Sequence, residues 1–299
     1  MQRKWMLGFV FLLTVTARLL LPSALAQEKE FRGQDAQRVA AWLRVSSDHA
    51  ADYRITLADA DDKPLKRLPK AVFRHSQPVR GDDIGAVYLW VDEAGTPGAI
   101  GSVFAFTIDA PSRWVAHEFH SLASAPLTAK WRDQSPWAPA EAGLTWKELP
   151  DSSAVAADAE GRLRQMRAFS RRFAGHSTDP KDGRWELRLV TQPIYQYTVE
   201  KPKDILGGAI FVLCQGTDPE VVISLQARKT ADATRWHYAC AAFSDYGLNV
   251  ALDGKEVWSQ AKNSGSARNK AHWWSHQMEV KTLTAEQEAE LAKPMPATN

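Results

Sequence analysis

Glu118 and His120 are the two side chains whose types and spacing could do chemistry, two residues apart in the string HEFHS. Residues two apart on a β-strand project from the same face, so this carboxylate and imidazole can hydrogen-bond or act together as acid and base. His117 projects from the opposite face. Two structural interpretations stay open beside the catalytic one: a buried pair satisfied by hydrogen bonds, or a solvated strand face.

Patterns that bind metals or phosphate are weak. The string from His117 to His120 is one residue short of the zincin pattern, which needs two histidines four apart on a helix. His272 and His276 are four apart, but their neighbours favour a strand, so a helical metal-binding pair is only an alternative. We expect no metal and no cofactor. Gly216–Glu220 fits a plain β-turn in which Asp and Pro take their usual places.

The chain contains two similar stretches, Lys70–Leu127 and Gln192–Leu248, whose offset stays within about two residues. This similarity predicts an internal duplication, and it also points to the Glu118 and His120 pair. An alternating face that is apolar in the second stretch carries the acid and the imidazole in the first. In this alignment Trp236, Tyr238, Cys240 and Ala242 correspond to Trp114, Ala116, Glu118 and His120.

Each stretch follows a helical pattern, at about Gln34–Ser47 and Gly161–Ala174, and continues as short strands separated by turn residues. We therefore predict an α+β fold of two tandem repeats, each a helix packed on an antiparallel β-meander, in a cystatin-like or nuclear-transport-factor-like arrangement. The expected parts are a signal peptide (1–26), a first repeat (27–125), a Pro- and Trp-rich connector (126–158), a second repeat (159–258) and a polar tail with a short strand and a terminal helix (259–299).

The N-terminus has the pattern of an export signal. Arg3 and Lys4 precede a mostly apolar run, and Ala24-Leu25-Ala26 has the small residues that signal peptidase accepts. We expect a periplasmic or extracellular protein. The alternative is an uncleaved signal that anchors the chain, and this is the one way in which we expect the protein to be attached to a membrane. Cleavage after Ala26 takes three of the 37 basic residues and leaves 34 against 35 acidic ones, a net charge of −1. This near-neutral charge argues against a nucleic-acid partner.

Tryptophans and cysteines give further expectations. Trp131, Trp137 and Trp146 lie in the predicted connector, where we expect their indoles to dock on domain surfaces or to contact a ligand. A turn at Gly216–Glu220 would set Cys214 opposite Ile223, which a second turn sets opposite Cys240. The two thiols would then lie two strand spacings apart, beyond disulfide reach. We expect both to be free and buried; a disulfide would mean a different strand order.

Four strings resemble an uncharacterised family of exported planctomycetal proteins: Glu118–Leu122, Leu163–Phe173, Leu187–Tyr197 and Gly216–Glu220. The likeness spans about two thirds of the chain. It implies an exported bacterial protein, and it supplies no catalytic residues because no activity is known for that family.

Two functions are consistent with the sequence. The favoured one is an exported, non-catalytic module that binds a small molecule or a protein through a cleft, since catalytic signatures are missing and tryptophans are many. The alternative is a hydrolase-type enzyme that uses Glu118 and His120. That alternative needs a pocket over the pair and a further polar group.

Overall fold

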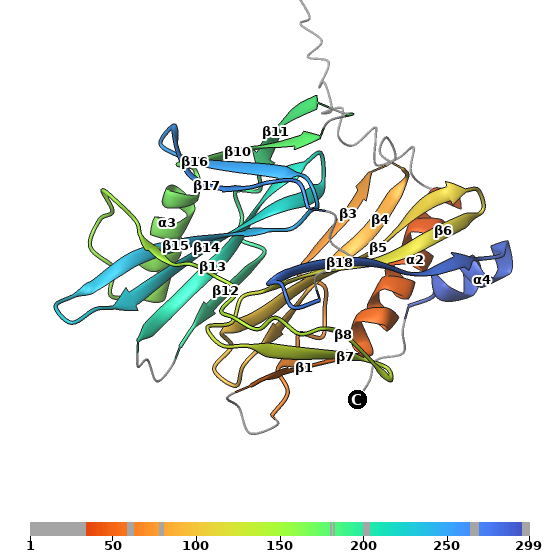
Figure 1. The fold of residues 1–299 in the computed structure, drawn as a ribbon, viewed down its shortest axis with the longest axis horizontal. Helices are drawn as coiled ribbons and strands as arrows, with labels where there is room; N and C mark the ends of the chain where they lie inside the picture. The colour runs from red at the N-terminus through yellow and green to blue at the C-terminus, as the bar shows by residue number, and fades with distance from the viewer. Residues whose placement is uncertain are drawn as a thin grey trace, which may run out of the picture. The chain divides into compact units, whose positions relative to one another are not determined.

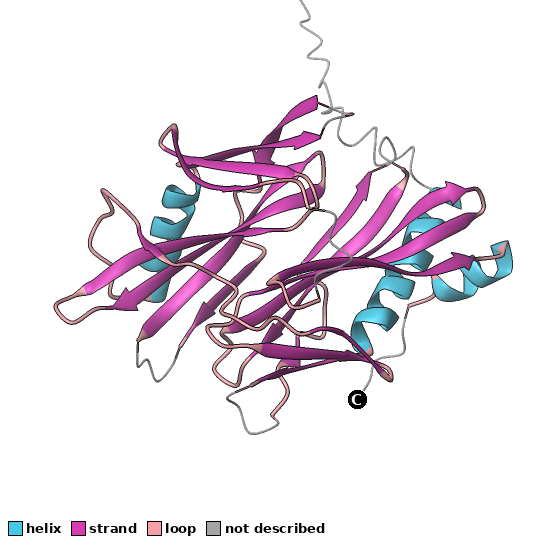
Figure 2. Ribbon diagram, in the orientation of Figure 1, coloured by secondary structure: helices cyan, strands magenta, loops and turns pink. Residues whose placement is uncertain are grey.

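The computed structural model describes residues 34–58, 63–77, 81–179, 181, 183–199, 204–263 and 269–294. The predicted signal peptide lies outside this range. From Gln37 onward the chain forms one unit, and its strands and helices are distinguished in Figure 2. None of the helices in the described part of the chain has the length and apolar character needed to cross a bilayer.

The expected α+β fold of two helix-on-meander repeats is wrong. Strands make up 53% of the structure and helices 15%, and the strands form large, curled antiparallel sheets. Local patterns predicted many of the individual strands, but they did not show which distant edges pair. The strand nearest the C-terminus joins a strand that ends at Ser121, more than 150 residues earlier in the sequence. The described helices are α2 (Gln34–Ala51), α3 (Ala159–Ser170) and α4 (Ala285–Leu291).

The first large sheet has six strands in the order β18-β6-β5-β4-β2, with β3 also paired to β4 (Figure 1). All of these pairings are antiparallel. The strands are β2 (Lys66–Arg67), β3 (Phe73–Gln77), β4 (Asp83–Val91), β5 (Pro97–Asp109), β6 (Ser112–Ser121) and β18 (Trp273–Thr282).

A smaller sheet in the order β1-β7-β8 lies in the same half of the chain. It consists of β1 (Tyr53–Leu57), β7 (Leu127–Trp131) and β8 (Gln134–Trp137). Two of its strands therefore come from the segment 126–158, which the sequence suggested was an extended connector. Alternate residues of β7 are buried, the pattern of a strand with one face on a core.

The second large sheet has nine strands in the order β17-β16-β10-β11-β13-β14-β15-β9, with β12 also paired to β13. The turn between β16 and β17 has two residues, Asp253 and Gly254, and both have positive φ, as a type I′ turn requires. The strands are β9 (Lys147–Glu148), β10 (Phe173–Asp179), β11 (Gly183–Leu189), β12 (Tyr195–Thr198), β13 (Ile205–Gln215), β14 (Asp218–Lys229), β15 (Thr234–Ala242), β16 (Gly247–Leu252) and β17 (Lys255–Gln260).

Three apolar clusters hold these elements together. The first packs α2 and the small sheet on one face of the first large sheet, around Trp42, Trp90 and Phe119. The second packs α3 against the second large sheet and includes buried residues of its strands β10 and β16. The third lies between the two large sheets, where Val87 and Leu89 of β4 join Val212 of β13. Burial of apolar surface in this third cluster stabilises the contact between the large sheets.

The terminal helix α4 begins at the N-cap Thr284. Thr284 Oγ1 accepts a hydrogen bond from Gln287 N, and Gln287 Oε1 accepts one from Thr284 N. This reciprocal pair is a capping box, which satisfies two backbone donors that the first turn of a helix leaves unpaired. α4 therefore follows β18 directly.

Candidate functional site

Glu118 lines a cavity of about 680 Å³ to which both large sheets contribute. We call this cavity the acidic cleft because four of its described lining residues are Asp or Glu, and no described lining residue is Lys or Arg. A further five lining residues are aromatic. The described lining residues are Gly81, Asp83, Phe104, Phe106, Ala116, Glu118, Asp218, Phe243, Ser244, Asp245, Tyr246, Trp273, Ser275, His276 and Gln277.

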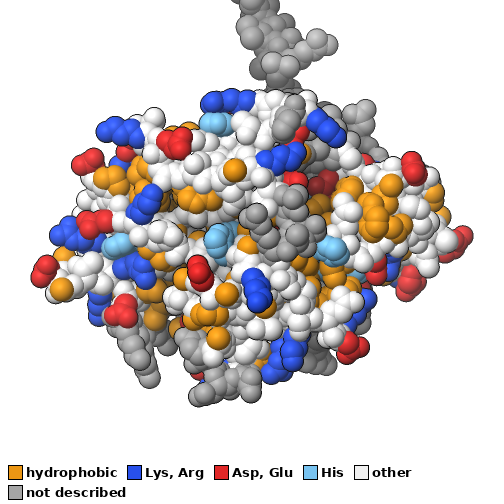
Figure 3. Space-filling view, in the orientation of Figure 1, with side chains coloured by type: hydrophobic (Ala, Val, Ile, Leu, Met, Phe, Trp, Pro, Cys, Tyr) orange, Lys and Arg blue, Asp and Glu red, His pale blue; other side chains and the backbone are white. Residues whose placement is uncertain are grey.

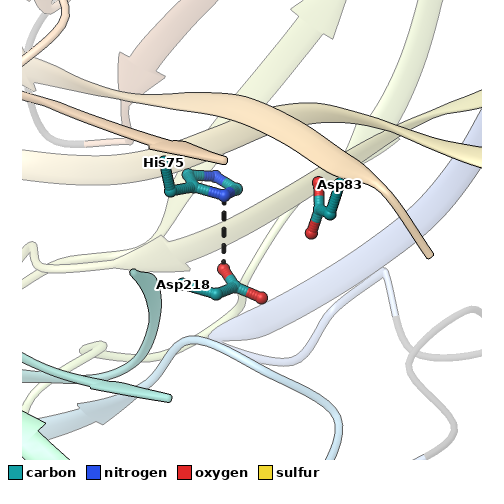
Figure 4. Close-up of side chains that lie close together, drawn as sticks. All are labelled: His75, Asp83 and Asp218. Carbon is teal, nitrogen blue, oxygen red and sulfur yellow. Dashed lines mark ion pairs between the residues drawn. The ribbon is translucent and has the colours of Figure 1, made fainter. Parts of the chain in front are cut away.

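His75, Asp83 and Asp218 come together (Figure 4), and Asp83 and Asp218 line the acidic cleft. One potential ligand atom from each residue lies within 4.8 Å of the others. His75 and Asp83 are buried, and the side chain of Asp218 keeps 21% of its exposure. His75 Nδ1 lies 3.6 Å from Asp218 Oδ1. The cluster therefore has one nitrogen and two carboxylate donors, with one carboxylate open to solvent.

The imidazole of His75 lies over a glycine of the neighbouring strand. His75 of β3 pairs with Gly85 of β4, and a Cβ at Gly85 would lie 2.6 Å from His75 Nε2. Only a residue without a side chain leaves this room, because real Cβ atoms do not approach a ring atom so closely. The same nitrogen lies 3.3 Å from Ser102 Oγ of β5. Gly85 and Ser102 thus position the ring.

Asp218 reaches His75 because the turn between β13 and β14 packs on β3. Thr217 Oγ1 donates a hydrogen bond of 2.8 Å to Ser76 O, and Gln77 Nε2 donates one of 2.7 Å to Gln215 O. These bonds link the two large sheets through residues that are about 140 positions apart in sequence. Asp218 is the first residue of β14, so fixing the turn also fixes its carboxylate.

The electrostatics of the cleft centre on Glu118. Burial raises the pKa of the Glu118 carboxyl well above its usual value, and the nearby carboxylates of Asp218, Glu220 and Asp245 raise it further. A hydrogen bond of 3.0 Å from Trp273 Nε1 to Glu118 Oε1 acts in the opposite direction. Glu118 is therefore held toward its neutral acid form, beside carboxylates that repel further negative charge.

His120 is not among the residues that line the cleft with Glu118. Its ring is buried, Nδ1 lies 2.7 Å from Ser121 O, and burial lowers its pKa to about 3. A neutral imidazole enclosed in this way is not placed to exchange protons with a ligand in the cleft. The hydrolase hypothesis required both residues at one pocket, and the structure places only Glu118 there.

His117 projects from the opposite face of β6, into the core of the first sheet. Its Nδ1 lies 2.7 Å from Tyr53 Oη, and its Nε2 lies 2.9 Å from His49 Nδ1. Burial holds the pKa of His117 well below its usual value. This histidine is satisfied within a core, away from the acidic cleft.

The contrast between β6 and β15 that drew attention to Glu118 was misaligned by one residue. The register of β4, β5 and β6 can be compared with that of β13, β14 and β15. In this comparison His117, and not Ala116, occupies the position on β6 that Tyr238 occupies on β15. Tyr238 and Cys240 belong to the second core, as Val115 and Phe119 belong to the first. Glu118 therefore corresponds to the inter-sheet face of β15, whose residues Ala239 and Ala241 are buried against the other sheet.

The three candidate tryptophans lie outside the cleft. Trp131 and Trp137 are buried in the core of the first sheet, and Trp137 Nε1 donates a hydrogen bond of 2.9 Å to Ala271 O. Trp146 is partly buried against the inter-sheet cluster, with the guanidinium of Arg228 over its ring. The tryptophan that does line the cleft is Trp273, in the segment where the sequence predicted a strand.

Cys214 and Cys240 are both buried and form no disulfide. Burial raises the pKa of each thiol to about 12. The predicted pairing of Ile223 with Cys240 matches the structure, but Ile223 faces Phe211 on its other side, where Cys214 was expected. The turn has two residues instead of five, which shifts the register by three. Cys214 consequently lies in the inter-sheet cluster and Cys240 in the second core.

His272 and His276 do not form a helical pair. His276 lies on β18 and lines the cleft, whereas the ring of His272, just before the strand, packs 5.4 Å from that of His120. Sequence reasoning also missed His75, Asp83 and Asp218. The turn expected over Gly216–Glu220 comprises only Gly216 and Thr217, and Asp218, the first residue of β14, lies at the cleft. No local signal joined this residue to His75, because the contact depends on how the sheets pack.

Comparisons with protein families, with curated proteins and with solved structures found no match. The likeness to exported planctomycetal proteins therefore stays a prediction from the sequence. The arrangement of the cleft itself is what suggests a function: carboxylates and aromatic rings face one volume that is large enough for a small molecule.

Proposed function

We propose that this protein is an exported, non-catalytic binding module that holds a small, positively charged ligand in the acidic cleft. The observation that carries the proposal is the combination of four carboxylic acids and five aromatic rings around one cavity of about 680 Å³. Ligand pockets commonly have volumes of about 300–1,000 Å³. Export is the expectation from the N-terminal sequence pattern, and the described residues do not bear on it.

The lining chemistry supports a cation over an anion. Asp218 and Asp245 lie close enough to Glu118 to raise its pKa, so an anionic ligand would meet the same repulsion. A cation would reduce it. Phe106 and Tyr246 are partly exposed at the cleft, where ring faces can attract an ammonium or guanidinium group. On the face drawn in Figure 3, basic and acidic side chains are interspersed.

The geometry supports binding better than hydrolysis. A hydrolase needs a nucleophile or general base beside a general acid, and the sequence offered His120 for one of these parts. That imidazole is neutral and enclosed, as described above. Glu118 in its acid form can still donate a hydrogen bond to a ligand, which is a role in recognition.

The proposal is tested by calorimetric titration of the mature chain at low ionic strength with putrescine, choline and succinate as probes. We expect the two cations to bind and the dianion not to bind. Asp245→Asn and Phe106→Ala should each weaken cation binding about tenfold, because each removes one attractive group. The matched control is Glu186→Gln, which changes an exposed carboxylate of β11 outside the cleft. Binding of succinate alone, or equal affinities in all variants, would overturn the proposal.

A further inference from the structure

We infer that His75, Asp83 and Asp218 form a binding site for a divalent transition-metal ion at the wall of the acidic cleft. This inference rests on the proposed function, because it names a metal ion as the positive charge that the cleft holds. The donors come from β3, β4 and β14, so both large sheets would supply ligands to one ion.

The spacing of the donors suits a single ion. Ligand atoms bound tetrahedrally to zinc at about 2.1 Å lie about 3.4 Å apart. His75 Nδ1 and Asp218 Oδ1 are 3.6 Å apart, close to that spacing. All three donor atoms lie within 4.8 Å of one another. A contraction of at most about 1.4 Å would therefore complete the site.

The surroundings of His75 fix its ring in the orientation that a metal ligand needs. Metal-bound histidines usually donate their second ring N–H to a neighbouring oxygen, which sets the tautomer. A hydrogen on His75 Nε2, donated to Ser102 Oγ at 3.3 Å, leaves the lone pair of Nδ1 on the side of Asp218. Gly85 provides the space in which the ring can lie this way.

The donor types select the class of metal. One imidazole and two carboxylates suit zinc, manganese or iron(II), whereas calcium and magnesium prefer oxygen donors alone. Three protein ligands leave at least one coordination position for water or a ligand. Asp83 and Asp218 both line the cleft, so the remaining positions would face its interior.

The test is a titration of Mn²⁺ into the chelator-treated mature chain, followed by electron paramagnetic resonance of the free ion, with Zn²⁺ as competitor. We expect one Mn²⁺ per chain, displaced by Zn²⁺ and not by Mg²⁺ at equal concentration. His75→Ala and Asp218→Asn should each weaken binding at least tenfold. His237→Ala changes a histidine of β15 outside the cleft and should leave binding unchanged.

Asp218→Asn keeps the test decisive if His75→Ala fails to fold, because Asp218 is partly exposed and changes little in size. Mn²⁺ affinity that is equal in the wild type and in Asp218→Asn would overturn the metal site. Putrescine binding without Mn²⁺ binding would overturn this inference and leave the proposed function standing. Failure of every cation to bind would overturn both.

Discussion

Two places in the molecule are built alike and yet contain different chemistry. In the first large sheet, His75 of β3 lies over Gly85 of β4. In the second, Tyr197 of β12 lies over Gly208 of β13, and a Cβ there would lie 2.6 Å from the Tyr197 hydroxyl. Each ring uses the space that a glycine on the paired strand leaves open. The backbone arrangement is therefore shared, and the difference lies in the side chains.

The tyrosine forms a closed pair. Its hydroxyl accepts a hydrogen bond from Gln226 Nε2, and burial raises its pKa above the usual value for tyrosine. The histidine instead faces a carboxylate from the other sheet, Asp218, beside the acidic cleft. The comparison teaches that this backbone arrangement does not itself make a site. The donors at the cleft are the His75 imidazole and the carboxylates of Asp83 and of Asp218, which begins β14.

The largest expected effect comes from filling the two spaces. Gly208→Ala would set a Cβ 2.5 Å from the backbone oxygen of Leu225, and Gly85→Ala would set one 2.4 Å from Phe104 Cβ. Overpacking of this kind costs about 1–3 kcal/mol. We expect the free energy of unfolding of both variants to fall by about that amount. Urea denaturation followed by tryptophan fluorescence measures the change.

The two glycine variants should differ in metal binding. Gly85→Ala displaces the His75 ring and should weaken Mn²⁺ binding, whereas Gly208→Ala should leave it unchanged. Gly101→Ala is a matched control in the first sheet, since its Cβ would meet the ring of Phe119 in the core instead of His75. Equal Mn²⁺ affinity in Gly85→Ala and Gly101→Ala would show that the glycine does not position His75.

A smaller effect is expected from opening the closed pair. Tyr197→Phe removes the hydroxyl and with it the hydrogen bond from the buried Gln226 amide, which contributes about 0.5–1.5 kcal/mol. Urea denaturation measures the change. Tyr195→Phe is the control: its half-buried hydroxyl donates to Gly95 O, and water can replace that bond at a lower cost. A Tyr197→Phe protein as stable as the wild type would mean that the phenol–amide bond contributes nothing.

Much of the local structure could be predicted from the sequence. Tyr53–Leu57, the Asp253-Gly254 hairpin and the Thr284 capping box all follow from alternation or from turn and cap chemistry. Each depends on neighbours a few residues away. The pairing of Ile223 with Cys240 was also correct, because a short turn joins the two strands.

The assembly could not be predicted in the same way. Trp131 and Trp137 looked like parts of a connector because prolines surround them, yet their strands add a sheet to the first core. The register error at Cys214 came from a turn three residues shorter than expected. His75 and Asp218 are 143 positions apart in sequence, and only the packing of β3 on the β13–β14 turn brings them together. Alternation of apolar residues and turn chemistry depend on neighbours in sequence, so they do not predict such long-range contacts.

The smallest expected effect tests the charge difference between the two places. Glu118 lines the acidic cleft together with Asp218. Burial raises the folded-state pKa of Glu118 above its unfolded value, and nearby carboxylates raise it further. The folded protein therefore binds this proton more tightly than the unfolded chain does. Its contribution to stability is full below the unfolded pKa, about 4.3 for a glutamate, and falls as the pH rises from there toward the folded pKa.

Glu118→Gln removes this titration and keeps an oxygen that can accept the Trp273 hydrogen bond. The variant should match the wild type at about pH 4 and become the more stable of the two as the pH rises, because the wild type alone must ionise a buried acid. Thermal unfolding across the pH range measures this divergence. Glu186→Gln, at an exposed carboxylate, should run parallel to the wild type. Parallel curves for Glu118→Gln as well would mean that neither burial nor the carboxylates of Asp218 and its neighbours raise the pKa of Glu118, and the electrostatic distinction between the His75 and Tyr197 places would be lost.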